Sequence, residues 1–154
     1  MRLGLGISIP GTSGLVQAAF SPLDLSPVLW LDASDTSTIT EVSNAVSQWD
    51  DKSGNGNDVV QATAALQPTT GTRTLNSLNV IDFQDDGMNV TFSSSISQPN
   101  TIISVLELDN TSQSASFFDG STAAARNLGG TSTTTYRMLS DTQITGGTTD
   151  TDPH

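Results

Sequence analysis

Residues 79–92 read Asn-Val-Ile-Asp-Phe-Gln-Asp-Asp-Gly-Met-Asn-Val-Thr-Phe, two β-rich runs separated by an acidic turn. The run at 79–83 predicts a strand, because β-branched and aromatic residues fit the pleated surface of a sheet. Residues 85–92 predict a turn followed by a second strand. Asp86-Gly87 favours a tight hairpin here, since Gly adopts a positive φ without steric penalty. This stretch therefore indicates an antiparallel β protein.

Further β-rich runs lie on both sides of this stretch, separated by turn signals roughly every 8–15 residues, the spacing of a sandwich or barrel. The longest, at 101–108, is expected to be a central strand. The densest turn signal is Asp-Lys-Ser-Gly-Asn-Gly-Asn-Asp at 51–58. The other predicted strands are residues 27–31, 45–49, 59–61, 116–120 and 134–138.

The composition supports the same fold class. The chain of 154 residues is long enough for one domain, and it contains 21 Ser, 22 Thr and 13 Gly, which suit short strands joined by turns. Only 34% of its residues are hydrophobic and 14% are charged. This low content of Lys, Glu and Arg excludes helical bundles and coiled coils. The sequence predicts an all-β globule.

The charge balance excludes several partners. A net charge of −11 repels nucleic acid and anionic membranes, because both are bound through Lys and Arg. An acidic surface is compatible with neutral sugars, with divalent cations or simply with solubility. The chain contains no Cys, which excludes disulfides and thiolate metal sites. No stretch approaches the roughly 18–20 apolar residues of a membrane span.

The N-terminal segment differs in composition from the rest of the chain. Residues 1–21 contain an apolar run interrupted by Gly4, Gly6, Pro10 and Gly11, which favours a flexible leader. A secretion signal is the alternative, because Arg2 provides a positive start and small residues come after the run. The folded domain is expected to span residues 22–154.

Two motifs carry a resemblance to a known family. Residues 28–35 read Val-Leu-Trp-Leu-Asp-Ala-Ser-Asp, and residues 46–56 read Val-Ser-Gln-Trp-Asp-Asp-Lys-Ser-Gly-Asn-Gly. Together with Gln-Pro-Thr at 67–69 and Val-Ile-Asp-Phe at 80–83, they resemble the concanavalin A-like, laminin G-like jelly-roll superfamily. In particular, they resemble the copies found in bacteriophage tail and virion proteins and in bacterial surface proteins.

This resemblance implies a jelly-roll sandwich of two packed antiparallel sheets on a virion, in the extracellular space or on a cell surface. Such domains are usually non-catalytic and serve adhesion, carbohydrate binding or architecture. Family members continue beyond the Gly-Gly-Thr-x-Asp-Thr-x-Pro-His segment that residues 146–154 match. The sandwich is therefore expected to be C-terminally incomplete, with unpaired sheet edges. His154 is expected to be structural.

A metal site is one interpretation of the 51–58 loop. Asp51, Ser53 and Asn55 alternate as oxygen ligands do in the first half of an EF-hand-like calcium loop. The twelfth position, which should hold a bidentate carboxylate, is Ala62. The preferred interpretation is a structural turn held by side-chain hydrogen bonds, without a resident cofactor, and Ca²⁺ is the alternative.

A degenerate hydrolase is a further hypothesis. Glu107 and Asp109 alternate like the carboxylates on the catalytic strand of laminarinase-type glycosidases of this fold. Ser112 occupies the position of the acid, and Glu41 is the only other Glu in the chain. Glycoside hydrolysis needs a second catalytic carboxylate at the position of the acid, and this strand lacks it. The domain is therefore expected not to be an enzyme.

Two functional classes therefore stay open: a module that binds polysaccharide or another virion or surface protein, and a purely architectural spacer. Trp30 and Trp49 lie in apolar patterns and are expected in the core rather than as sugar platforms. If a sugar binds, carboxylates and amides would contact its hydroxyls and an aromatic ring its C–H patches. The candidates are Asp85, Asp86, Asp119, Asn127 and Tyr136, for which ordinary turn formation is the alternative.

Overall fold

A computed structural model describes residues 20–97, 99–109, 116–120, 128–132, 135–140 and 142–148. Its regular structure is almost entirely β, which confirms the predicted class. The strands are β1 (Ile39–Val42), β2 (Ala45–Trp49), β3 (Val59–Val60), β4 (Thr69–Leu75), β5 (Leu78–Asp82), β6 (Ser116–Phe118), β7 (Leu128–Ser132), β8 (Thr135–Ser140) and β9 (Thr142–Thr148). The 3₁₀ turns are η1 (Pro22–Leu25), η2 (Thr36–Thr38) and η3 (Ala64–Leu66). No helix among the described residues has the length and apolar character needed to cross a membrane.

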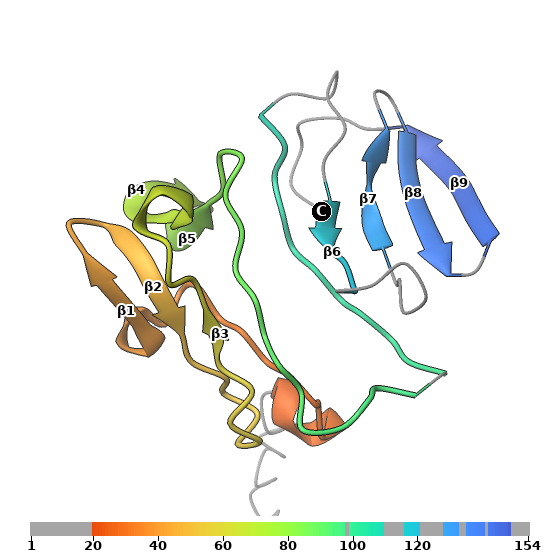
Figure 1. The fold of residues 1–154 in the computed structure, drawn as a ribbon, viewed down its shortest axis with the longest axis horizontal. Coiled ribbons are helices and arrows are strands. Elements are labelled where there is room, and N and C mark those ends of the chain that lie inside the picture. The colour runs from red at the N-terminus through yellow and green to blue at the C-terminus, as the bar shows by residue number, and fades with distance from the viewer. Residues whose placement is uncertain are drawn as a thin grey trace, which may run out of the picture.

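The strands form two open antiparallel sheets (Figure 1). In the first, the order is β1-β2-β4-β5, and β3 pairs with β2 beside this path. In the second, strands β6 to β9 succeed one another in chain order. Each described strand therefore pairs mainly with a neighbour that is close in the sequence.

Two hairpins of the first sheet turn on the same backbone geometry. Ser43 and Asn44 connect β1 to β2, and Asn76 and Ser77 connect β4 to β5. All four residues have positive φ, between 50° and 71°. This is the backbone of a two-residue type I′ turn, whose twist matches that of the flanking strands. Asn accepts this conformation more readily than most residues, so each hairpin contains one residue suited to its turn.

The structure confirms several predicted strands. The run at 45–49 is β2, residues 59–60 form β3, and residues 79–82 lie within β5. In the second sheet, residues 116–118 form β6 and residues 135–138 lie within β8.

Three strand predictions were wrong. Residues 27–31 form no strand, because Trp30 bonds through its backbone to Asp51 and Lys52 instead of to a neighbouring ladder. The hairpin at 85–92 is absent: Asp85 adopts a φ of 62°, and Asn89 makes a single bridge back to Val60 of β3. The predicted central strand at 101–108 is not paired with any strand among the described residues.

The core of the described region is small and lies where β2, β3 and the start of β4 meet. Val46 is fully buried and Val59 is 7% exposed. Pro68, also fully buried, accepts a hydrogen bond from the Val46 N–H at 2.8 Å. Trp30 and Trp49 are half-buried. The buried aliphatic side chains thus join β2 directly to β3, the strand that comes after the 51–58 loop.

Val46→Ala should lower the free energy of unfolding by about 2 kcal/mol, because it removes two buried methyl groups and leaves a cavity. Val42→Ala is the matched control, since that side chain is 75% exposed and should change stability by less than about 0.5 kcal/mol. Urea denaturation followed by circular dichroism measures both. Equal losses in the two variants would place the core elsewhere.

Candidate functional site

The carboxylate of Asp51 organises the 51–58 loop. Oδ1 accepts hydrogen bonds from the backbone N–H groups of Trp30 at 2.9 Å and Ser53 at 2.8 Å. Oδ2 accepts from the Ser53 hydroxyl at 2.7 Å and the Asn57 N–H at 3.0 Å. Each carboxylate oxygen therefore receives two protein donors, which matches its two lone pairs.

Amide side chains of the same loop hold the segment before Trp30. Asn55 Nδ2 donates to the carbonyl groups of Pro27 at 3.0 Å and Val28 at 3.1 Å. The buried Asn57 donates to the Val28 carbonyl at 2.8 Å. The Gly54 and Gly56 backbones have φ of 87° and 70°, so the tight path of the loop depends on glycine. Side chains thus replace the ladder that residues 27–31 lack.

Lys52 adds a charged clamp to this loop. Its Nζ lies 2.9 Å from Asp32 Oδ2 and 2.7 Å from Asp35 Oδ2. It also lies 4.7 Å from the centroid of the Trp30 ring, a cation–π distance. The Lys52 N–H donates to the Trp30 carbonyl at 2.8 Å, so backbone and side chain both hold the same Trp.

These contacts lower the pKa values of three carboxyl groups in and around the loop. The Ser34 hydroxyl and then Lys52 lower the pKa of Asp32, and Lys52 and then Ser37 lower the pKa of Asp35. Burial alone would raise the pKa of Asp51, but the Ser53 hydroxyl and the donated N–H groups outweigh it and lower that pKa. Asp32, Asp35 and Asp51 are therefore kept ionised near neutral pH.

The hydrogen bonds bear on the calcium hypothesis for Asp51, Ser53 and Asn55. A cation at Asp51 would have to displace backbone N–H donors, and the Ser53 hydroxyl already donates a hydrogen bond to Asp51. Within the part of the chain that the structure describes, no group of three or more His, Cys, Asp or Glu side chains is placed to hold a metal. The network favours the structural turn, and calcium binding stays a prediction.

A second charged cluster forms around Arg73 of β4. Its Nη1 and Nη2 each lie 2.6 Å from an oxygen of Asp109, a bidentate pair. Asp82 Oδ1 lies 3.4 Å away and Glu107 Oε1 3.9 Å away. The Arg73 hydrogen bonds lower the pKa of Asp109. Glu107 and Asp109, the two carboxylates that resemble the catalytic strand of a glycosidase, both lie within ion-pair distance of this guanidinium, an arrangement that suits charge pairing.

The predicted sugar-contacting residues are dispersed over the fold. Asp85 and Asp86 form the turn after β5, where Asp86 Oδ2 accepts from the Gln84 N–H at 3.1 Å. Asp119 comes directly after β6, and Tyr136 lies in β8 opposite Thr131 and Gly146. Asn127 and His154 lie outside the described residues, as does nearly all of the predicted leader. Asp85 and Asp86 thus act as turn formers.

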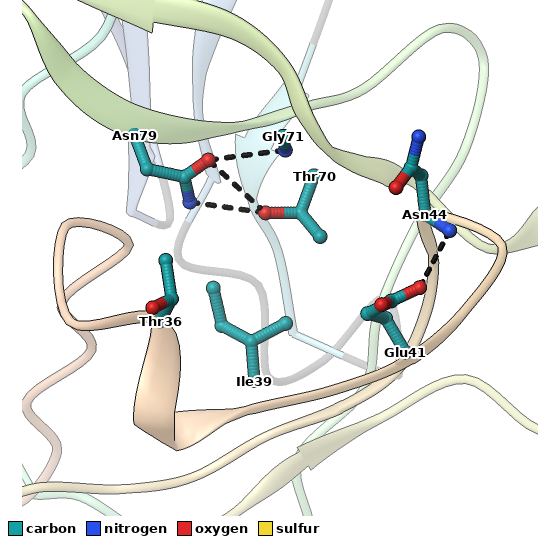
Figure 2. A pocket seen from close by; sticks show the side chains of 7 residues that line it. All are labelled: Thr36, Ile39, Glu41, Asn44, Thr70, Gly71 and Asn79. Carbon is teal, nitrogen blue, oxygen red and sulfur yellow. Dashed lines mark hydrogen bonds between the residues drawn. The ribbon is translucent and has the colours of Figure 1, made fainter.

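A pocket that the sequence analysis did not anticipate lies between the η2–β1 segment and the β4–β5 hairpin. It has a volume of about 240 Å³, below the roughly 300–1,000 Å³ typical of sites for drug-sized ligands. Figure 2 shows its lining side chains converging from these elements. They are Thr36, Ile39, Glu41, Asn44, Thr70, Gly71 and Asn79.

The floor of the pocket is held by Asn79. Its Oδ1 accepts from the Gly71 N–H at 3.0 Å, and its Nδ2 donates to the Ala33 carbonyl at 2.7 Å. Its amide also exchanges hydrogen bonds with the buried Thr70 hydroxyl. The β4–β5 register shifts after Thr70, and Gly71 has a φ of 71°. This irregularity turns backbone and side chains toward the hollow, as β-bulges do.

The rim of the pocket retains hydrogen-bonding capacity. Glu41 Oε2 accepts from the Asn44 N–H at 2.5 Å, which leaves Oε1 available. Among the described residues, the Asn44 side-chain amide and the Thr36 hydroxyl make no hydrogen bond. Ile39 adds the apolar surface. The rim can therefore donate and accept hydrogen bonds while carrying one negative charge.

Comparison with known proteins finds no match to this chain among family models, curated proteins or solved structures.

Asp51→Ala should lower the free energy of unfolding by about 3 kcal/mol, because it leaves several partly buried N–H donors without an acceptor. Asp50→Ala is the matched control, since that neighbouring carboxylate accepts one bond from Gln48 and should cost at most about 1 kcal/mol. Urea denaturation compares them. A loss at Asp51 no larger than that at Asp50 would contradict the central role of this carboxylate.

Stability should also fall on acidification. Because the folded pKa values of Asp32 and Asp51 lie below their ordinary values, their stabilisation is complete above about pH 4 and is lost as the pH falls through the folded values. Asp51→Asn should be less stable than the parent chain at pH 7, and the difference should narrow toward pH 2. Urea denaturation across this range checks the trend, and a difference independent of pH would refute it.

Proposed function

We propose that this chain is a non-catalytic, jelly-roll-type adhesive or structural module that binds neutral carbohydrate weakly at the pocket beside the β1–β2 turn. The pocket carries the proposal. Its rim brings together the Thr36 hydroxyl, the Glu41 carboxylate and the Asn44 amide, all with unused hydrogen-bonding capacity. These groups complement sugar hydroxyls, which donate and accept together.

The size and charge of the pocket narrow the ligand class. A volume of about 240 Å³ and an open rim suit one sugar residue of a chain rather than an enclosed oligosaccharide. The free oxygen of Glu41 and the net charge of −11 disfavour acidic sugars and phosphates. Among the described residues that line the pocket, Ile39 is the only apolar side chain and none is aromatic, so the expected affinity is low.

The carboxylates near β4 support a non-catalytic role. Arg73 pairs with Asp109 and lies close to Glu107, the two groups that resemble a glycosidase pair. Ser112 occupies the position of the general acid, so this strand pattern lacks the second catalytic carboxylate that glycoside hydrolysis needs. Binding without turnover is therefore the better interpretation.

The setting of a phage-like virion or a bacterial surface rests on the sequence resemblance at residues 28–35 and 46–56. In this chain those two motifs are joined by the Asp51 and Lys52 contacts. Because the two motifs contact each other, we interpret them as parts of one motif rather than as two independent chance matches. Polysaccharide or neighbouring virion and surface proteins are the partners that this setting implies.

A purely architectural spacer is the second candidate. The observation that favours it is that Asp51 and Ser53 hydrogen-bond to each other within the loop rather than offering these polar groups to a ligand. A spacer would need that stability and no ligand.

A glycan array probed with the full chain separates the two candidates, and a bound neutral glycan is the expected result. Asn44→Gly should then weaken binding about tenfold, because it removes the side-chain amide yet tolerates the positive φ of the turn. Asn76→Gly, in the other hairpin turn and outside the pocket, is the matched control. Calorimetric titration with the bound glycan measures both variants.

Two outcomes would contradict this proposal. Absence of glycan binding by a chain with a cooperative unfolding transition would leave the architectural role. Equal affinity in the parent chain and Asn44→Gly would move the binding site away from the pocket.

A further inference from the structure

Residues 101–108 combine the strongest β pattern of the chain with an unpaired backbone. The segment reads Thr-Ile-Ile-Ser-Val-Leu-Glu-Leu. Among the described residues it belongs to no strand and makes no backbone hydrogen bond. Figure 1 shows it as an extended stretch of chain crossing the molecule, coloured teal. Its N–H and C=O groups are thus available to another extended strand.

The side chains of this segment are also exposed. Ile103 is 78% exposed and Val105 is 74% exposed, and these two residues share one face because they alternate along the chain. Ile102, on the other face, is 46% exposed. An apolar, β-branched segment in this state gains both hydrogen bonds and apolar burial when a strand pairs with it.

One end of the segment is fixed by Arg73. The bidentate pair with Asp109 holds the residue just after the segment, and Glu107 lies 3.9 Å from the same guanidinium. This anchoring reduces the ordering entropy that pairing would otherwise cost. Arg73 also offsets the negative charge at that end, which lowers repulsion between two acidic chains.

We propose that residues 101–107 pair antiparallel with the same residues of a second copy of this chain, around a twofold axis at Ser104. In this register Ile102 faces Leu106, and Ile103 faces Val105. The two Ile103 and two Val105 side chains then form one apolar cluster on a single face of the ribbon. Such a contact is isologous, because both copies use the same surface.

Charge and polarity favour this register over the alternatives. Centring the pair on Ser104 places Glu107 opposite Thr101, a neutral polar residue. Parallel in-register pairing would place Glu107 against Glu107, and like charges directly opposite are destabilising. Centring on Val105 would place Glu107 opposite Ile103. The segment is therefore most self-complementary around Ser104.

Analytical ultracentrifugation of the full chain should show a concentration-dependent monomer–dimer equilibrium. Ser104→Pro should weaken dimerisation about tenfold or more, because Pro removes an N–H donor at the centre of the ladder. The matched control is Ser95→Pro, in another exposed segment outside the pairing, which should dimerise like the parent chain. Circular dichroism monitors the fold, and Ser104→Pro should retain the parent spectrum, since this N–H makes no backbone hydrogen bond within the described part of the monomer.

Cysteine cross-linking tests the register, because the chain has no native Cys. Two copies of Ser104→Cys would face each other at the axis, within the Cα separation that a disulfide accepts, and should form a covalent dimer rapidly under mild oxidation. Thr101→Cys, which faces Glu107 of the partner copy, should cross-link slowly. A chain that stays monomeric to its solubility limit, or equal cross-linking at both positions, would overturn the proposal.

Discussion

The structure of the described region depends on the carboxylate of Asp51, whose two oxygens accept as many hydrogen bonds as they have lone pairs. Asp51 accepts four hydrogen bonds from donors before, within and after its own turn. Because these donors include the N–H of Trp30, the bonds fix a non-strand apolar segment against the loop. Lys52 then lies over the Trp30 ring, and Val59 emerges from the loop into the small core beside Val46. A single ionised group thus links turn geometry to packing.

The scarcity of cations in this chain gives Lys52 and Arg73 an unusual role. Lys52 contacts two carboxylates, and Arg73 lies within ion-pair distance of three. In a chain of net charge −11, each such cation stabilises several acidic groups at once rather than one exposed pair. Arg73 in particular connects β4 to the residue just after the 101–108 segment.

The polar pocket and the unpaired 101–108 segment arise from interruptions of regular pairing. The pocket forms where the β4–β5 register shifts and Gly71 takes a positive φ. The segment carries a strand sequence without a strand partner in the described part of the chain. Irregular pairing leaves polar backbone or side-chain groups available, which is why such places bind ligands or other strands. The proposed carbohydrate site and the proposed strand-pairing surface lie at separate interruptions of this kind.

The sequence by itself determined the β class, the local strands β2, β3, β5, β6 and β8, and the tight path of the 51–58 loop, because short-range propensity and glycine conformation act over a few residues. It did not predict β1, β4, β7 or β9. It wrongly predicted strands at 27–31 and 101–108 and a turn followed by a strand at 85–92, since β propensity does not specify a partner strand. The pocket was not predictable, because Glu41, Asn44 and Asn79 look like ordinary turn or strand residues in isolation. Only tertiary structure brings them together, through long-range register and hydrogen bonds that no local pattern encodes.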